Sequence, residues 1–318
     1  MDRRREPKYR KVYAFAPSGM VTGGPELCHQ LVHEIRSLGG DAAVHYTPDP
    51  STEVPAPYRA YDVEVSRASE WGAGDAVIYP ETMLRRMPLR SRATPFIWWQ
   101  SYDNAVNTVS SRPRQLISRA FKRTLCNVQR ISRCRHVFQS HYAKDKLASW
   151  GFPGDMLSDY ITTEPATFTN DFRQNIICFN PKKGAAITRS LIAANPDLKF
   201  APIANMNKDQ VLRLLESSML YVDFGEHPGK DRLPREAAMR GAVVLVGRRG
   251  SAGNSLDVPL DAQYKLEFGS DFITRASRQI RRILTEFPLH QQLQACFRTS
   301  LRGEHSTFRG QVQSLFFH

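Results

Sequence analysis

Residues 221–245 read YVDFGEHPGKDRLPREAAMRGAVVL, and this stretch decides the fold. It overlaps an apolar strand pattern at Leu220–Phe224 and ends in a second one at Ala242–Val246. A charged loop and a short helix containing Ala237 and Ala238 lie between them. Two buried strands joined through a loop and a helix predict a parallel sheet of the α/β class, because parallel strands need such a crossover.

The loop after the first strand carries an unusual density of polar groups. These are Glu226, His227, Lys230, Asp231, Arg232, Arg235 and Glu236. In an open α/β sheet, ligands bind beyond the carboxyl ends of strands and against helix N-termini. Cations, a histidine and carboxylates gathered there suit a phosphorylated, hydroxyl-rich ligand such as a sugar nucleotide. The alternative is a solvated charged loop. Glycine and proline residues that interrupt the charged run between the two strands make this alternative less favourable.

This segment resembles the C-terminal donor-binding motif of GT-B glycosyltransferases, especially the group 1-like bacterial enzymes of surface-polysaccharide assembly. In that family a glutamate opening the helix holds the ribose hydroxyls of the donor nucleotide, and Glu236 matches it. The superfamily often carries a second glutamate eight positions earlier, where this chain has Pro228. The resemblance leaves Glu226 or His227 to take over that role, and makes His227 a candidate catalytic residue. It also implies donor contacts from Gly229, Lys230, Asp231, Arg232 and Arg235.

A second glycine-containing loop lies near the N-terminus. Val12–Pro17 reads as a buried strand, Ser18–Gly24 as a loop, and a helix is expected from about Pro25 to Leu38. Bare backbone amides at such a turn can bind a phosphate or a sugar hydroxyl. The loop is similar to the glycine-rich first loop of GT-B enzymes, which makes Gly23 and Gly24 candidate donor contacts. The alternative is that the glycines serve turn geometry alone.

Residues 95–107 read PFIWWQSYDNAVN and place polar groups at another strand end. The segment resembles a WW-polar-S-x-D-N signature of some bacterial glycosyltransferases. Asp103, just past the strand Phe96–Trp99, could reach an acceptor hydroxyl as a general base. The paired tryptophans are otherwise core residues. Expected acceptor contacts are Trp99, Ser101, Asn104 and, after the later strand His136–Gln139, His141.

Residues 177–196, ICFNPKKGAAITRSLIAANP, form a strand, an Asn-Pro-Lys-Lys-Gly turn and a helix. The unit resembles the opening of the C-terminal domain of GT-B enzymes, where a basic residue contacts the donor diphosphate. Asn180, Lys182 and Lys183 are therefore expected at the donor site. A solvated lysine pair is the alternative.

The net charge of +13 is unevenly distributed, since residues 1–150 hold 23 basic and 14 acidic residues. No acidic residue occurs between Asn104 and Lys144, where arginines interleave with apolar residues at helical spacing. This pattern predicts a basic amphipathic helix. Its apolar face can pack in a core, and its basic face can meet water, anionic lipid headgroups or a phosphate backbone. An anionic acceptor, a membrane surface and nucleic acid are all possible partners.

Composition agrees with a folded enzyme, because 318 residues suffice for two domains. No apolar run reaches the roughly 18–20 residues of a membrane span. Met1–Lys11 is expected to be a frayed basic arm. The five cysteines show no metal-binding spacing, which favours buried thiols in a reducing cytoplasm. We expect a cytoplasmic protein, with attachment to the inner membrane face as an alternative.

The resemblance spans most of the chain and implies the GT-B fold: two Rossmann-like domains facing across a cleft, with a C-terminal helix crossing back. The expected parts are an acceptor-binding domain at residues 1–155, a nucleotide-sugar-binding domain at 156–300 and the returning helix at 301–318. Asp159 and Asp231 are isolated in the sequence, so no acidic pair stands where a metal would be needed.

The expected function is metal-independent transfer of a hexosyl or related group from a nucleoside diphosphate sugar, the donor substrate, with no cofactor. The acceptor is a hydroxyl of a glycan or lipid-linked glycan. The alternatives are a glycosyltransferase acting on hydroxylated DNA bases and a non-catalytic polyanion-binding protein of the same fold.

Overall fold

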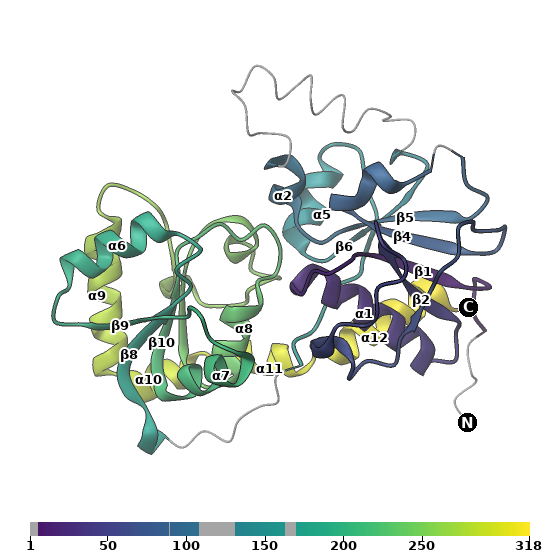
Figure 1. The fold of residues 1–318 in the computed structure, drawn as a ribbon. Helices are drawn as coiled ribbons and strands as arrows, with labels where there is room; N and C mark the ends of the chain where they lie inside the picture. The colour runs from purple at the N-terminus through teal and green to yellow at the C-terminus, as the bar shows by residue number, and fades with distance from the viewer. Residues whose placement is uncertain (1–5, 89, 108–130, 163–169) are drawn as a thin grey trace. The chain divides into compact units, whose positions relative to one another are not determined.

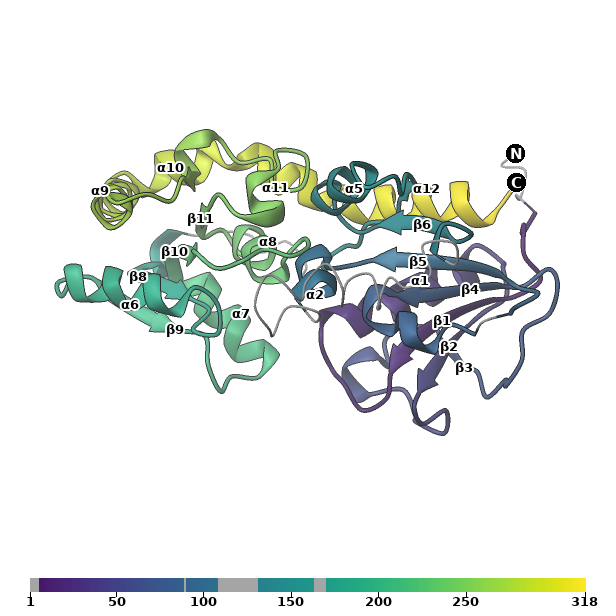
Figure 2. The ribbon, with the colours of Figure 1, turned by 90° about the horizontal axis from the view of Figure 1, so that it is seen from above.

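The computed structural model describes residues 6–88, 90–107, 131–162 and 170–318 (Figure 1). Most of the predicted basic amphipathic helix lies outside the described residues. The chain divides into two compact units. The first comprises Met1–Asp159 and His305–His318, and the second comprises Tyr160–Glu304. Each unit is built around its own parallel sheet flanked by helices (Figure 1, Figure 2).

The first unit contains a sheet of seven strands in the order β3-β2-β1-β4-β5-β6-β7, every neighbouring pair parallel. The strands are β1 (Val12–Pro17), β2 (Ala42–Thr47), β3 (Glu64–Val65), β4 (Ala76–Pro80), β5 (Thr94–Trp99), β6 (Arg135–Phe138) and β7 (Asp155–Met156). Their near-continuous apolar runs are typical of strands covered on both faces. The predicted strands at Val12–Pro17 and Phe96–Trp99 are confirmed.

Helices α1 (Gly23–Ser37), α2 (Tyr102–Asn107) and α5 (His141–Ala148) follow β1, β5 and β6, and α12 (Glu304–Phe316) completes the unit. The turns η1 (Ala56–Tyr58) and η2 (Glu81–Arg86) are 3₁₀ helices. Helix α12 lies beside α1, because the buried Glu34 carboxylate accepts hydrogen bonds from His305 and Arg309 (Figure 1).

The N-terminal arm differs from its prediction over the residues that are described. Pro7 forms an antiparallel bridge with Phe317, and the amide of Lys8 donates to the carbonyl of Phe316 at 2.8 Å. Arg10 pairs with the buried carboxylate of Asp75. From residue 6 onward the arm is therefore held by the end of the chain, and the expectation that it frays is wrong there.

The second unit contains a sheet of five strands in the order β12-β11-β10-β8-β9, again parallel throughout. The strands are β8 (Gln174–Phe179), β9 (Lys199–Pro202), β10 (Ser218–Asp223), β11 (Val243–Gly247) and β12 (Lys265–Leu266). The strands β10 and β11 confirm the two apolar runs that flank the charged loop. Leu220, Tyr221, Val243, Val244 and Leu245 are fully buried there.

Six helices are described in this unit: α6 (Ala185–Ala194), α7 (Lys208–Ser217), α8 (Arg232–Met239), α9 (Phe272–Thr285), α10 (Phe287–Leu293) and α11 (Ala295–Arg302). Short 3₁₀ turns are η3 (Asn170–Phe172), η4 (Gly250–Gly253) and η5 (Ala262–Tyr264). Right-handed crossovers put α6 on one face of the sheet and α7 and α8 on the other. Among the described residues no helix is both long enough and apolar enough to cross a membrane.

The strand order reverses once in each sheet, between β1 and β4 in the first unit and between β8 and β10 in the second. At such a switch point the loops leave neighbouring strands in opposite directions and open a crevice at the carboxyl ends of the strands. These two points are therefore where the fold places ligands.

Candidate functional site

The switch point of the second sheet is formed by two loops in backbone contact. Gly184, at the start of α6, has φ +57°, and a Cβ there would lie 2.7 Å from the carbonyl carbon of Phe224. A Cβ on Gly225 would lie 2.6 Å from the Cβ of Lys183. Glycine is required at both positions because any side chain would push the loops apart.

A third loop holds the charged loop from the side of β11. Gly250 has φ +55°, and a Cβ there would come within 2.0 Å of the His227 carbonyl oxygen. The Ser251 amide donates to that oxygen at 2.8 Å, and the Ser251 hydroxyl donates to the carbonyl of Gly229 at 2.5 Å. The loop between β10 and α8 is thus fixed at two of its carbonyl groups.

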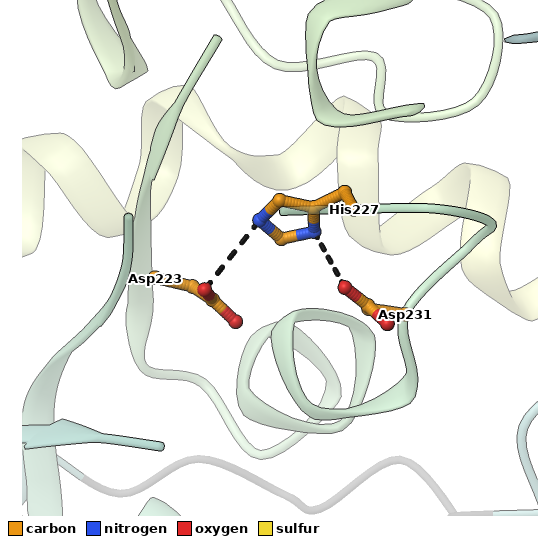
Figure 3. A group of neighbouring side chains, drawn as sticks. All are labelled: Asp223, His227 and Asp231. Carbon is orange, nitrogen blue, oxygen red and sulfur yellow. Dashed lines mark ion pairs between the residues drawn. The ribbon is translucent and has the colours of Figure 1, made fainter. Parts of the chain in front are cut away.

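His227 lies between two carboxylates (Figure 3). Its Nδ1 forms an ion pair with Asp231 Oδ2 at 2.7 Å, and its Nε2 lies 3.5 Å from Asp223 Oδ1. The residue is 1% exposed. Burial alone would lower the pKa of His227, but the hydrogen bond to Asp231 and the charges of both aspartates outweigh it, so the pKa is raised. The geometry therefore favours an imidazolium.

Both aspartates are themselves anchored. The Tyr221 hydroxyl donates to Asp223 Oδ2 at 3.0 Å, and Lys183 Nζ lies 2.5 Å from Asp231 Oδ2. Burial alone would raise the pKa of Asp231, but His227 and Lys183 hold it below its ordinary value. Asp231 is therefore not isolated, as its sequence position suggested, because the loop brings the end of β10 and the start of α8 to opposite sides of one ring.

Among the described residues, Asp223, His227 and Asp231 form a group that could hold a metal ion. Each offers one potential ligand atom, and these atoms lie within 4.8 Å of one another. Each ring nitrogen of His227 faces a different carboxylate, so the imidazole separates the two aspartates (Figure 3). The ammonium of Lys183 already forms an ion pair with the Asp231 carboxylate. The arrangement fits internal neutralisation by two cationic side chains better than an added divalent ion.

A second charge cluster lies around the start of α8. Lys230 Nζ is 2.8 Å from Glu304 Oε1, and Arg235 Nη1 is 2.8 Å from Glu304 Oε2. Arg235 is only 1% exposed and also donates to the carbonyl oxygens of Lys230 and Asp231. Arg235 is thus a buried guanidinium that fixes the loop backbone. Sequence reasoning missed Glu304 because it lies far from this loop along the chain.

Glu236 lies one turn into α8, four residues after Arg232. It is 9% exposed, and its Oε1 lies 3.3 Å from Arg232 Nη2. At the neighbouring strand end, the Lys182 side chain is exposed, and the Lys182 amide is capped by Asn180 Oδ1 at 3.0 Å. The structure therefore brings every sequence-predicted donor residue of the second unit to one edge of its sheet.

The remaining predicted residues belong to the first unit. Asp103 accepts a hydrogen bond from the Tyr142 hydroxyl at 3.0 Å. Trp99 is 2% exposed, and its indole N–H donates to Nδ1 of His136. Burial lowers the pKa of His136, which favours the neutral imidazole that can accept this hydrogen bond. Ser101 and Asn104 flank Asp103, while His141 opens α5 directly after Ser140, whose hydroxyl caps that helix.

The switch point of the first sheet contains a carboxylate that sequence reasoning did not select. Glu81 directly follows β4, is 6% exposed, and its Oε2 accepts a hydrogen bond from the Gln100 amide at 2.9 Å. Burial raises its pKa from 4.5 to about 7. A Cβ on Gly24 would lie 2.9 Å from Gln100 Oε1, so the first turn of α1, which begins at Gly23, packs at Gly24 against the Gln100 side chain.

Comparisons with known proteins identify the fold. No protein-family model matches the chain, and no curated protein matches it in sequence. Among solved structures, sucrose-phosphate synthase from Thermosynechococcus elongatus aligns with a TM-score of 0.66 at 11% identity, covering 96% of this chain and 98% of that one. HepE of Anabaena, in complex with UDP-glucose, gives 0.65 at 11% identity, covering 96% and 98%.

TarM of S. aureus aligns with a TM-score of 0.57 at 10% identity and covers 77% of this chain. This chain spans 55% of TarM's length. At these identities the likeness concerns the fold. The two parallel sheets and their helices have the GT-B fold of glycosyltransferases, which confirms the predicted architecture class.

Proposed function

We propose that this protein is a glycosyltransferase that moves a sugar from a nucleoside diphosphate sugar to a hydroxyl of a glycan or lipid-linked glycan. The observation that carries the proposal is the edge of the second sheet, where three glycine-dependent loops hold basic side chains beside the start of α8 at the switch point. The GT-B fold supports it, and HepE of that fold was crystallised with UDP-glucose and with UDP.

The donor diphosphate would meet positive charge from two sources. Lys182 is exposed at the end of β8 and Lys183 is half-buried beside it, and the first turn of α8 offers backbone amides and a positive helix end. Charge develops on the diphosphate as the glycosidic bond breaks, and fixed cations stabilise that charge without reorganisation. His227 would act by fixing the loop, because its ring lies between Asp223 and Asp231 and its charge is balanced by theirs.

Glu236 would hold the ribose of the donor. A carboxylate can accept two hydroxyl hydrogen bonds, and charge-assisted bonds are stronger than neutral ones. Glu236 now contacts Arg232, which is a weak contact at 3.3 Å. Exchange of that contact for two ribose hydroxyls is therefore the expected change on donor binding.

Acceptor activation is assigned to the first unit. Asp103 would take the proton of the acceptor hydroxyl if the reaction inverts the anomeric centre, and the Tyr142 hydroxyl orients its carboxylate. A retaining reaction needs no such base. The stereochemistry of the product therefore determines whether Asp103→Asn lowers kcat.

Metal independence is part of the proposal, because the exposed Lys182 and the positive N-terminal end of α8 would supply the charge that a divalent ion supplies elsewhere. Full activity in EDTA is expected. Complete loss of activity in EDTA that manganese restores would refute this part and would reopen the Asp223–His227–Asp231 group as a metal site.

The test of the whole proposal is a thermal-shift screen across UDP-, GDP-, ADP- and CMP-sugars, followed by a hydrolysis assay with the donor that binds. Bound donor raises the melting temperature by mass action, and an enzyme then releases free nucleotide. A donor that binds without any release of nucleotide, with or without acceptors, would identify a non-catalytic binding protein instead.

The net charge of +13 and the excess of basic residues in positions 1–150 favour one alternative acceptor, hydroxylated bases of DNA. A DNA-modifying enzyme would retard duplex DNA in a gel, with an affinity that falls steeply with salt. Sugar transfer to glycan acceptors without such retardation would exclude DNA as the substrate.

A further inference from the structure

Glu304 holds the loop before α8 with both of its carboxylate oxygens. One oxygen pairs with Lys230 and the other with Arg235, each at 2.8 Å. Arg235 links Glu304 to the loop backbone, because its other N–H groups donate to the carbonyls of Lys230 and Asp231. The side chains of Lys230 and Glu304 are each 10% exposed. A single carboxylate thus pairs with two cations of the proposed donor site.

The position of Glu304 in the chain connects this contact to helix α12. Glu304 is the last residue of the second unit and the first residue of α12, and the rest of that helix clusters with the first unit. The first residue of α12 therefore contacts the donor loop with its side chain. A ligand that competes for Lys230 would weaken one contact of that residue.

We propose that Glu304 is a positioning residue that competes with the donor diphosphate for Lys230, so that donor binding loosens the first turn of α12. The inference rests on the proposed function, since it requires a diphosphate at this loop. Arg235 makes the exchange possible: it keeps its own pair with Glu304 when Lys230 turns to the phosphate, so no buried carboxylate is left without a partner.

Thermodynamic linkage makes the effect reciprocal. If the diphosphate weakens the Lys230–Glu304 pair, then removal of the charge at residue 304 strengthens diphosphate binding. Glu304→Gln should therefore lower the Kd for a nucleoside diphosphate about three- to tenfold and leave the Kd of the corresponding nucleoside unchanged. A residue that only supports the fold would instead weaken both ligands.

The experiment uses calorimetry on the full chain with UDP, GDP and ADP, and with uridine, guanosine and adenosine. Lys230→Ala should weaken the diphosphate that binds, and in that background Glu304→Gln should no longer tighten it. Glu267→Gln is the matched control, since Glu267 forms an exposed pair with Arg248 in the same unit. Its affinities should equal those of the wild type.

A second readout needs no variant. Hydrogen exchange in wild-type protein should become faster at residues 304–308 when the diphosphate binds, although other loops of the site become protected. Unchanged or slower exchange there, or a Glu304→Gln protein that binds the diphosphate no more tightly, overturns the inference while leaving the proposed function standing. If none of the three diphosphates binds the wild type, the proposed function itself fails, and the inference fails with it.

Discussion

Glu236 is a buried carboxylate one turn into α8, with 9% of its surface exposed. Glu236→Gln keeps the shape and removes the charge. Each charge-assisted bond to ribose contributes about 1.5–3 kcal/mol, and about 1.4 kcal/mol corresponds to tenfold in Kd. Donor affinity measured by calorimetry should therefore fall about tenfold or more.

The control for this prediction is Glu267→Gln, which should bind donor like the wild type. The burial of Glu236 and its contact with Arg232 indicate that Glu236→Gln also lowers the melting temperature slightly. Wild-type donor affinity in Glu236→Gln would mean that the loop is a structural charge cluster and not a ribose site.

Glu81 provides a test of pH dependence. Its pKa is raised from 4.5 to about 7 by burial in the folded protein. The folded state therefore binds the proton more tightly than the unfolded state. The stability from this group is fully present below pH 4.5 and is lost as the pH rises through 7.

Glu81→Gln imitates the protonated carboxyl, so it should be similar to the wild type in stability at pH 4.5 and more stable at pH 8. At about 1.36 kcal/mol per pKa unit, the gain is at most roughly 3 kcal/mol. Melting temperatures at both pH values measure it. Glu70→Gln, at an exposed carboxylate of the same unit, should show no such gain. Equal shifts in melting temperature for Glu81→Gln and Glu70→Gln would contradict the raised pKa of Glu81.

Residue type and local position were sufficient to predict many members of the candidate site. Glycine, lysine and glutamate residues between two apolar strands predict that the loop after β10 belongs to a binding site. The structure places Lys183, Asp231 and Glu236 at one edge of the sheet. Glu304 and Glu81 could not be predicted in this way, because their importance depends on partners distant in the sequence. The burial of Arg235 could not be predicted either, since arginine side chains are ordinarily exposed to solvent.

At the scale of elements, the contact between the loops after β8 and β10 depends on Gly184. Gly184→Ala places a Cβ 2.7 Å from backbone atoms of Phe224 at φ +57°. Backbone atoms cannot move aside as a side chain can, so the second unit should lose roughly 2 kcal/mol or more of stability. Diphosphate affinity should fall with it, because the two loops must separate.

Gly310→Ala is the matched control. Gly310 lies within α12, where a Cβ would have no other atom within 4 Å, and alanine there should add about 0.5–1 kcal/mol. Thermal melts and calorimetry on both variants complete the comparison. A Gly184→Ala protein with wild-type melting temperature and affinity would show that the loop contact is dispensable.

Apolar runs made the strands predictable as elements, since parallel strands buried on both faces admit few polar residues. The sequence predicts that α1 starts at about Pro25, and the helix begins at Gly23. Glycine is a weak helix former, and the close packing of Gly24 against Gln100 is a tertiary effect that overrides that preference. The paired N-terminal arm was missed for a related reason: its partner Phe317 lies at the opposite end of the chain.

At the scale of the whole molecule, the first unit depends on α12. Phe308, Val312, Leu315, Phe316 and Phe317 are each 3% exposed or less. At about 1.5–3 kcal/mol for each buried side chain, they contribute roughly 7–15 kcal/mol, which equals the usual total stability of a domain. A chain ending at Glu304 should therefore fail to fold its first unit.

Limited proteolysis should cut the shortened protein throughout residues 6–159 and spare residues 170–304. Deletion of His318 alone, an exposed residue, should leave the digestion pattern unchanged. A shortened protein that resists cleavage in its first unit would show that α12 is an accessory and not part of that core.

The first unit is assembled from two pieces of chain separated by Tyr160–Glu304. A ribosome adds about 5–20 residues per second, so roughly 7–30 seconds pass between synthesis of the last strand of the first sheet and arrival of the helix that completes it. That interval is the time needed to synthesise the second unit, whose last helix, α11, ends two residues before α12 begins. The two units are therefore completed almost together, and until then the apolar surface that packs against α12 is exposed on the nascent chain, where chaperones can bind it.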